Sequence, residues 1–428
     1  MKLQKNVVIQ LNLPEIHGNQ IRFSWFPNFV FKQNYYSVQY PDLETIEASE
    51  GKLAEALFPL CLAFASIGAH IKLPVKISDE VLSRWRRVIQ IAIVHCFHTP
   101  LRYSISNGSA PANYKKYSGT QTVLCFGGGA ESLLSLGQLS DEPTTPLLAS
   151  FGGPCWSGSD PEKNPDKFEM DEKISKELGL KLLRVRSDFR KLIHPEAWQP
   201  YLKKDVSMLN TVLLLPFFIS FLIPLAESQQ IGRIVSGHEK MSLPKEYFCF
   251  SPVMTHAYGC VASGVDYESF LGKLRKEEVC RELYLKYPHL ARFQYSCWKN
   301  FHERWCHRCE LCMEYYALLK NFGVDPGLVG LEEARIHENR SELIAAVSQA
   351  AESRPGEFWE RLWDNLNLRE DAFMRDFLEE ARQKAEIYHS LKRVYNEAPH
   401  WMKQFYRNQK SFLKRLSPAE VLSSHELP

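Results

Sequence analysis

The sequence predicts an α/β protein built on a parallel, doubly wound sheet, and two observations predict it. From residue 121 onward, short apolar runs alternate with segments whose apolar residues recur at helical spacing. Such alternation is typical of parallel strands joined by right-handed helical crossovers. Several of the expected strands also end in glycine, which suits the carboxyl edge of a parallel sheet, where ligands bind.

The elements of this sheet are expected in strand–helix order. Each strand is a short apolar run, and each helix is a longer segment with apolar residues three and four positions apart. In chain order they are a strand at 122–126, a helix at 131–139, a strand at 146–151, a helix at 168–178, a strand at 180–185, an apolar helix from about residue 207 and a strand at 233–236.

Residues 1–118 are expected to form a mixed α+β region. The runs 7–13 and 21–26 alternate apolar and polar residues, as strands do, whereas 56–69 is apolar throughout and predicts a buried helix. Ser78 is suited to cap a further helix. The stretch 106–120 is rich in Ser, Asn, Gly and Pro and predicts a linker.

The chain is therefore expected to have three parts. Its 428 residues exceed one ordinary core, so two or three domains are expected. The sheet domain, with the cysteine cluster that follows it, would occupy 119–334, after the α+β region at 1–118. Charged residues with aromatics at helical intervals predict a helical appendage at 335–428.

Composition limits the partners and the location. The 52 basic and 50 acidic side chains give a formal charge of +2, which argues against a nucleic-acid arm or a polybasic anchor. The apolar stretch 211–226 is short for a bilayer and contains two prolines, so it predicts a buried helix broken near Pro224 and no membrane span. The first 20 residues lack the pattern of a signal peptide. A cytoplasmic protein with reduced thiols is expected.

Four of the eleven cysteines have the spacing of a metal site. Zn²⁺ takes four ligands in a tetrahedron, and the Cys-x2-Cys spacing lets a tight turn present two thiolates to one ion. Four thiolates leave no position for water, so a structural zinc ion is expected. An iron–sulfur cluster and a redox pair are the alternatives, and His302 or His307 could replace one thiolate. The expected ligands are Cys297, Cys306, Cys309 and Cys312.

A run of glycines separates the first strand of the sheet from its first helix. Gly127, Gly128 and Gly129 would let backbone N–H groups turn toward an anion, and the helix dipole would add to the attraction. Glu131 and Ser132 fall in the first turn of the helix, where the serine hydroxyl could join the amides. Taken alone, the pattern is equally compatible with phosphate binding and with a tight turn that needs glycine only for its φ angles.

Other polar groups are expected at the same edge of the sheet. Gly152 and Gly153 follow the second strand and are expected to help bind the nucleotide. After the fourth strand, His238 or Glu239 could act as a general base and Lys240 as a clamp for phosphate or carboxylate. With Ser132 these three are the candidate catalytic residues, and a solvated polar loop is the alternative for 238–240.

The glycine run resembles the PP-loop of the N-type ATP pyrophosphatases, usually written SGGxDS. Gly128, Gly129 and Ser132 match that loop, whereas Gly127 replaces its first serine and Glu131 its aspartate. The spacing of the four cysteines looks like that of 7-cyano-7-deazaguanine synthase and its relatives, in which they hold zinc. The triple glycine, the long region before it and the polar motif after the fourth strand also resemble the ATP-dependent epimerase of UDP-N-acetylmuramoyl-L-alanyl-L-glutamate. The resemblance covers roughly residues 120–325.

This resemblance implies an adenine nucleotide alpha hydrolase-like fold and an enzyme that uses ATP and Mg²⁺. A substrate carboxylate would attack the α-phosphorus of ATP, and pyrophosphate would leave onto the glycine loop. The most specific expectation is an epimerase of peptidoglycan-precursor synthesis in cell wall biogenesis, and a deazaguanine-type ligase is the next. The alternative of a different class is a degenerate nucleotide-binding module. The N- or C-terminal region could then support a homodimer or dock a partner protein.

Overall fold

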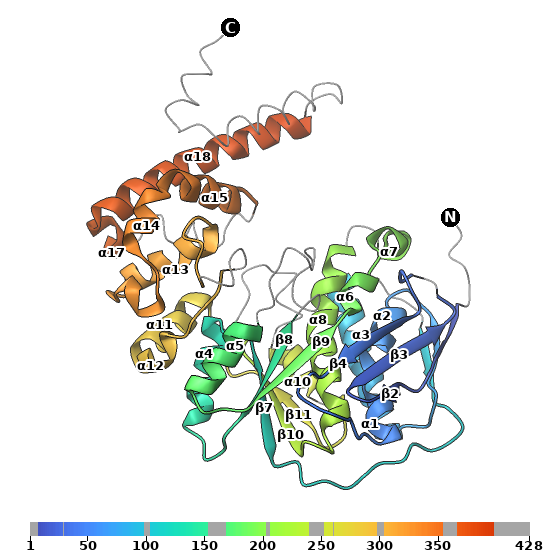
Figure 1. The fold of residues 1–428 in the computed structure, drawn as a ribbon. Helices are drawn as coiled ribbons and strands as arrows, with labels where there is room; N and C mark the ends of the chain where they lie inside the picture. Colours follow the sequence, from blue (N-terminus) through green and yellow to red (C-terminus); the bar gives the residue numbers. More distant parts are fainter. Residues whose placement is uncertain are drawn as a thin grey trace. The chain divides into compact units, whose positions relative to one another are not determined.

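The computed structural model divides the chain into two compact units, residues 1–279 (unit 1) and residues 280–428 (unit 2) (Figure 1). Each unit has its own helices and its own core. The described residues are 7–28, 30–97, 103–152, 168–202, 206–238, 252–259, 261–297, 304–353 and 366–397.

The described part of unit 1 contains an eleven-stranded sheet, one half of which is parallel throughout. This half has the order β11–β10–β7–β8–β9, with parallel pairing at each step. The four strands expected from the sequence are confirmed, and β11 is an addition. The bounds are β7 (Gln121–Phe126), β8 (Leu147–Gly152), β9 (Leu182–Ser187), β10 (Ile231–Ser236) and β11 (Asp266–Glu268).

The N-terminal strands continue this sheet beyond β9. Strand β4 (Tyr35–Gln39) pairs antiparallel with β9, where Val38 lies opposite Ser187. The order then runs β4–β3–β1–β5–β6, with antiparallel pairing as far as β1 and parallel pairing from β1 to β6. The sheet is therefore mostly parallel but mixed. The remaining bounds are β1 (Val8–Leu11), β2 (Glu15–His17, paired with β3), β3 (Gln20–Phe26), β5 (His70–Lys72) and β6 (Ser104–Ser106).

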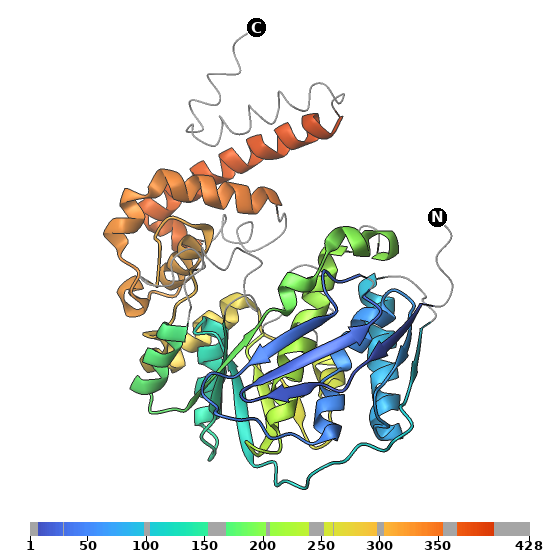
Figure 2. The ribbon, with the colours of Figure 1, turned by 45° about the vertical axis from the view of Figure 1, so that its right-hand side comes forward.

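Helices cover both faces of this sheet, as a doubly wound arrangement requires (Figures 1 and 2). On one face are α4 (Ala130–Ser140) and α5 (Phe168–Glu177), which confirm the two expected crossover helices. The other face carries α2, α3, α8 and α10, which pack on one another. The hydroxyl of Ser78 accepts from the Val81 N–H at 3.2 Å, so it caps α3 as expected. The other helices of the unit are α1 (Glu50–Glu55), α2 (Phe58–Ala65), α3 (Asp79–Phe97), α6 (Phe189–Leu192), α7 (Pro195–Leu202), α8 (Val206–Leu222) and α10 (Pro252–Tyr258).

The apolar helix α8 lies in the core of unit 1. Its Phe217 ring stacks on Phe189 at 4.1 Å and meets Tyr36 of β4 edge-on at 5.6 Å. The helix gives way to a short 3₁₀ turn at Ile223–Leu225, which contains Pro224, as expected. Among the described residues, no helix combines the length and the apolar character needed to cross a membrane.

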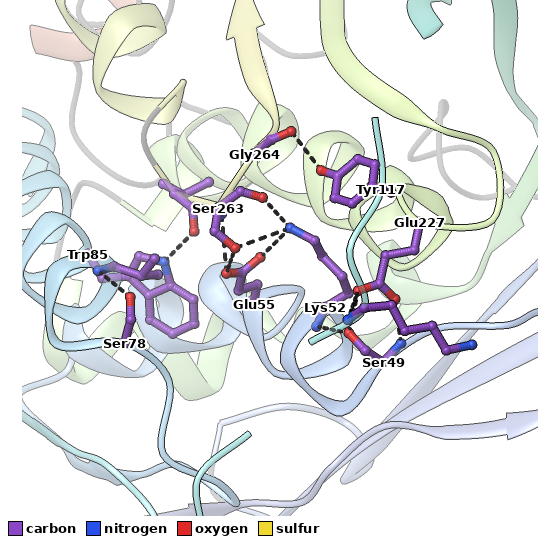
Figure 3. Close-up of polar contacts among 12 residues, drawn as sticks. Ser49, Lys52, Glu55, Ser78, Trp85, Tyr117, Glu227, Ser263 and Gly264 are labelled. Atoms are coloured by element: carbon purple, nitrogen blue, oxygen red, sulfur yellow. Dashed lines mark hydrogen bonds and ion pairs between the residues drawn. The ribbon is translucent and has the colours of Figure 1, made fainter. Parts of the chain in front are cut away.

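The stretch 106–120, expected to be a linker, is tied to the sheet domain by hydrogen bonds (Figure 3). The Tyr117 hydroxyl donates to the Gly264 carbonyl at 2.6 Å, and the Lys115 N–H donates to Glu227 Oε1 at 2.9 Å. Glu227 also accepts from the backbone and the hydroxyl of Ser49, at 2.8 and 2.7 Å. These contacts connect the N-terminal region to the turns that precede β10 and β11.

A buried ion pair lies at the centre of this polar cluster (Figure 3). Lys52 Nζ is 2.9 Å from Glu55 Oε2, and the two side chains are 1% and 0% exposed. Lys52 also donates to the Ser263 carbonyl, while Glu55 Oε1 accepts from the Ser263 N–H at 3.1 Å and from its hydroxyl at 2.7 Å. Each charge therefore has several polar partners, which is the condition under which a buried pair is tolerated.

Unit 2 is helical in its described part. Its helices α15 (Arg340–Ser353) and α18 (Ala372–Glu397) pack together, and the Ser348 hydroxyl donates to the Ala381 carbonyl at 2.9 Å. Both helices lie within residues 335–428, for which the sequence predicts helices. The remaining helices are α11 (Lys276–Lys286, which crosses the unit boundary), α12 (Pro288–Ala291), α13 (Glu310–Asn321), a 3₁₀ turn (Pro326–Val329), α14 (Glu333–Glu338) and α17 (Leu366–Glu370).

We predict that breaking the Lys52–Glu55 pair destabilises unit 1 far more than replacing both members. Lys52→Met leaves the Glu55 carboxylate buried without its cation and should lower the free energy of unfolding by roughly 3–5 kcal/mol. Lys52→Met/Glu55→Leu removes both charges and should recover most of that loss. Urea denaturation of the full chain measures both values.

The matched control is Lys176→Met, which breaks the exposed pair between Lys176 and Glu172. Since that lysine side chain is 74% exposed, we expect a change below about 1 kcal/mol. Equal losses in Lys52→Met and in the double variant would contradict the account of the pair.

Candidate functional site

The strand order has one switch point, here called the crevice, at the carboxyl edge of the parallel half. The chain leaves β7 for β8 and β9 on one side, and later returns to β10 and β11 on the other side. The connections that follow β7 and β10 therefore lead to opposite faces, and ligands of open α/β sheets bind where the order switches in this way. In this sheet the crevice lies between β7 and β10, whose last residues are paired, with Ser236 opposite Cys125.

The predicted glycine loop lies at this crevice. Gly127, Gly128 and Gly129 connect β7 to α4, and Gly128 has a φ of +68°, a conformation that suits only glycine well. Gly129 is the N-cap of α4 and has no side chain to bond the first-turn N–H groups. The first N–H groups of α4 thus carry the positive end of the helix dipole and have no side-chain cap. The loop before them has no Cβ atoms that would keep an anion away.

Ser132 braces the loop from inside the first turn of α4. Its hydroxyl accepts from the Gly127 N–H at 3.3 Å and donates to the Gly129 carbonyl at 3.1 Å. The residue is 5% exposed, whereas Glu131 before it is half-buried. Ser132 therefore stabilises the loop through two hydrogen bonds that the sequence did not reveal. The expected contact of its hydroxyl with phosphate would be additional.

The chain that leaves β10 presses against the start of α4. A Cβ added to Gly237 would lie 2.7 Å from the carbonyl carbon and oxygen of Glu131 and 2.8 Å from the Ser132 nitrogen. A Cβ added to Gly127 would have no atom of the described residues within 4 Å. Glycine is therefore required at position 237, where two backbones touch. At position 127 the space beside the loop is open among the described residues.

His238 lies next to this contact and is held by hydroxyl groups. Its Nδ1 is 2.7 Å from the Ser236 hydroxyl, and its Nε2 is 2.9 Å from Thr255 Oγ1. The Ser236 hydroxyl is also 2.5 Å from the Tyr267 hydroxyl, and Ser269 donates to the His238 carbonyl at 3.0 Å. Burial lowers the pKa of His238 to about 4, so the ring is neutral at pH 7.

Other predicted site residues have different surroundings or are not described. A Cβ on Gly152 would lie 2.4 Å from the Phe168 ring, so glycine at this position allows the ring to pack against the backbone. Two further acidic residues that follow strands are used structurally: Asp188 accepts from the Ser37 N–H at 2.9 Å, and Glu268 forms an ion pair with Arg233. Gly153, Glu239 and Lys240 lie outside the described residues.

The four cysteines of unit 2 come together as predicted. Their sulfur atoms all lie within 4.8 Å of one another, and all four residues are buried. Sγ–Sγ distances of 3.9, 3.7 and 3.5 Å join Cys297 to Cys309, Cys306 to Cys312, and Cys309 to Cys312. A zinc tetrahedron with Zn–S bonds of about 2.3 Å has S–S edges of roughly 3.8 Å. The cluster can therefore hold a metal ion such as zinc.

The backbone around the cluster is fixed by contacts that do not use the sulfurs. The Arg304 guanidinium donates to the carbonyls of Arg292 and Gln294 at 2.6 and 2.7 Å. His307 Nε2 accepts from the Glu332 N–H at 3.0 Å, whereas its Nδ1 is buried and has no hydrogen-bond partner among the described residues. Arg304 and His307 have φ angles of +64° and +56°, and such strain persists where the surroundings impose it. His302 lies outside the described residues.

Hydrogen bonds among the four thiols lower the pKa of one cysteine and raise the pKa of two others. The hydrogen bond to Cys297 acts to raise the pKa of Cys306, but those to Cys309 and Cys312 outweigh it and bring this pKa down to about 6. The same proton sharing, led by the bond to Cys297, raises the pKa of Cys309 and of Cys312. The sharing thus favours ionisation of Cys306, and the remaining protons would leave as a metal ion binds.

The chain matches no protein-family model, no curated protein and no solved structure with which it was compared.

We predict that the purified chain binds about one zinc ion and that Cys309→Ser loses it. Mass spectrometry under native conditions, or elemental analysis, measures the metal. The control is Cys61→Ala, which removes a buried thiol of α2 in the other unit and should leave the metal content unchanged. Brown absorbance from an iron–sulfur cluster, with no zinc, would contradict the prediction.

Acid should release this metal and destabilise unit 2. Bound thiolates have depressed pKa values, so the stability that they supply is present at neutral pH and is lost as the pH falls and protons compete with the metal. Thermal unfolding between pH 7 and pH 4, with and without EDTA, measures the effect. A melting temperature of unit 2 that is the same with and without EDTA at pH 7 would contradict it.

Proposed function

We propose that this chain is an ATP-dependent enzyme that adenylates a substrate carboxylate and releases pyrophosphate. The observation that carries the proposal is the glycine loop, which opens α4 at the point where the strand order switches between β7 and β10. Phosphate groups favour such helix starts because N–H groups and the helix dipole point toward them. The match of Gly128, Gly129 and Ser132 to the PP-loop pattern supports ATP as the ligand.

In the proposed reaction the loop would bind the two phosphates that leave. A carboxylate oxygen of the substrate attacks the α-phosphorus, the bond to the β-phosphate oxygen breaks, and an acyl-adenylate and pyrophosphate form. The N–H groups at the start of α4 would stabilise the charge that builds on the pyrophosphate. Glu131, in the first turn of α4, is the candidate ligand for the accompanying Mg²⁺.

We propose that the four cysteines hold a structural zinc ion. All four positions of a tetrahedron would be filled by thiolates, so no site would remain for water or substrate. The residues of the cluster are at most 5% exposed, which supports a role in folding unit 2.

The most specific form of the proposal is an epimerase of UDP-N-acetylmuramoyl-L-alanyl-L-glutamate. Adenylation masks the negative charge of the carboxylate and makes the neighbouring Cα–H more acidic, so a base can remove and return the proton. The triple glycine and the long region before it support this form. A deazaguanine-type ligase would instead let ammonia attack the acyl-adenylate, and the cysteine spacing supports that alternative.

A nucleotide-binding module without catalysis is the alternative of a different class. Gly127 has no hydroxyl where the PP-loop has serine, and Glu131 is one methylene longer than aspartate. The open space beside Gly127 allows a direct test, since a serine side chain fits there. Gly127→Ser restores the hydroxyl of the PP-loop pattern and should preserve or increase pyrophosphate release by an active enzyme.

The decisive assay is carboxylate-dependent exchange of labelled pyrophosphate into ATP. Exchange reports the acyl-adenylate whatever the next step is. Deuterium uptake from heavy water at Cα of the UDP-linked glutamate then identifies an epimerase, and dependence on ammonia identifies a ligase. The enzyme proposal fails if no carboxylate supports exchange or AMP formation in the wild-type chain and in Gly127→Ser.

We predict opposite outcomes for two alanine substitutions at the crevice. Gly237→Ala forces a Cβ into the backbone of Glu131 and Ser132, so α4 must shift; we expect exchange to fall at least roughly tenfold, because displaced donors lose transition-state contacts. Gly127→Ala adds the same methyl group to open space and should change exchange less than about twofold. Equal losses in the two variants would contradict this geometry, and circular dichroism checks that both are folded.

A further inference from the structure

Three hydroxyls and one imidazole form a continuous chain of hydrogen bonds beside the crevice. It runs from Tyr267 in β11 through Ser236 at the end of β10 to His238, and from there to Thr255 in α10. Ser236, Thr255 and Tyr267 are at most 6% exposed. A buried polar chain of this kind is stable only if each proton has an acceptor, so its protons must be ordered.

The chemistry of Tyr267 determines which group of the chain donates each proton and which group accepts it. A phenol oxygen donates more readily than it accepts, and burial raises the pKa of Tyr267 well above its ordinary value, so the proton stays on the ring oxygen. The Tyr267 hydroxyl therefore donates to Ser236, 2.5 Å away, in preference to Nδ1 of His238, which is 3.4 Å away. Ser236 has one proton of its own, and Nδ1 of His238, 2.7 Å away, accepts it.

The tautomer of His238 follows from this direction. A neutral imidazole whose Nδ1 accepts must have its proton on Nε2. That N–H then donates to Thr255 Oγ1, 2.9 Å away, and leaves the Thr255 hydroxyl to donate its proton onward. The low pKa of His238, caused by burial, agrees with a ring that keeps a single proton at pH 7.

We infer that Tyr267 and Ser236 are positioning residues that fix His238 as the neutral Nε2–H tautomer, and that His238 serves the site as a relay to Thr255. It would not be the general base suggested by the sequence, because both of its ring nitrogens are engaged by hydroxyl groups. The catalytic part of this inference rests on the proposed function; the tautomer does not. The base of the proposed reaction must then be another group.

The relay is also connected to the glycine loop through the backbone. Gly237, between Ser236 and His238, makes the contact with Glu131 and Ser132 described above. Hydrogen bonds on both sides of Gly237 therefore restrict the segment that presses on α4. Loss of one of them should loosen the loop as well as the ring.

The tautomer can be measured directly in the full chain. With ¹⁵N-labelled histidine, long-range nitrogen–proton spectra distinguish the protonated ring nitrogen from the unprotonated one. We expect His238 at pH 7 to be the Nε2–H form in the wild type, and Ser236→Ala and Tyr267→Phe to mix the two forms. Tyr36→Phe removes another buried phenol oxygen, which has no hydrogen-bond partner among the described residues, and should leave the His238 signals unchanged.

Activity then separates a relay from a base. Glutamine can place an N–H near the position of Nε2 but cannot take up a proton, so His238→Gln should retain at least roughly tenfold more deuterium uptake at Cα of the UDP-linked glutamate than His238→Ala if His238 is a relay. Equal loss in both variants would indicate a base and overturn the relay. An Nδ1–H or a protonated His238 in the wild type would overturn the inference whatever the activity. If the wild type shows no exchange, the proposed function fails and the tautomer alone decides the positioning claim.

Discussion

The contact between two backbones, at Gly237 and at the start of α4, is the constraint on which the candidate site depends. It exists because the strand order brings β10 beside β7, so the chain leaving one strand meets the helix that follows the other. With less than 3 Å from an added Cβ to the backbone atoms of Glu131 and Ser132, there is no room for a side chain at Gly237. The loop of Gly127–Gly129 and the hydroxyl chain through His238 are therefore parts of one rigid arrangement.

Unit 2 is organised by a different interaction. Four buried sulfur atoms, at separations close to the edge lengths of a tetrahedron, bring the segment at Cys306–Cys309 next to the first turn of α13 and could hold a metal ion there. Around them, Arg304 and His307 form hydrogen bonds with backbone groups. The chemistry proposed for unit 1 and the metal proposed for unit 2 can thus be tested separately.

Much of this arrangement could be predicted from the sequence because its signals are local. Strands β7–β10 follow from apolar runs, the glycine loop from three adjacent residues, and the metal cluster from the spacing of Cys306, Cys309 and Cys312. The continuation of the sheet into the N-terminal region could not be predicted, because pairing of β4 with β9 joins residues such as Ser37 and Asp188, which are 151 positions apart. Tyr267 was missed for a related reason. Its strand has three residues, too few to show a period in the sequence.

Phosphate binding at the start of α4 can be measured by amide NMR of the chain during titration with Mg²⁺–ATP. We expect saturable shifts concentrated at the N–H groups of Gly128–Ser132, with smaller shifts at Gly237 and His238, because those residues contact the loop or adjoin that contact. Pyrophosphate should shift the same loop amides. Shifts that leave Gly128–Ser132 unchanged while other parts of the chain respond, or no saturable shifts at all, would contradict the account.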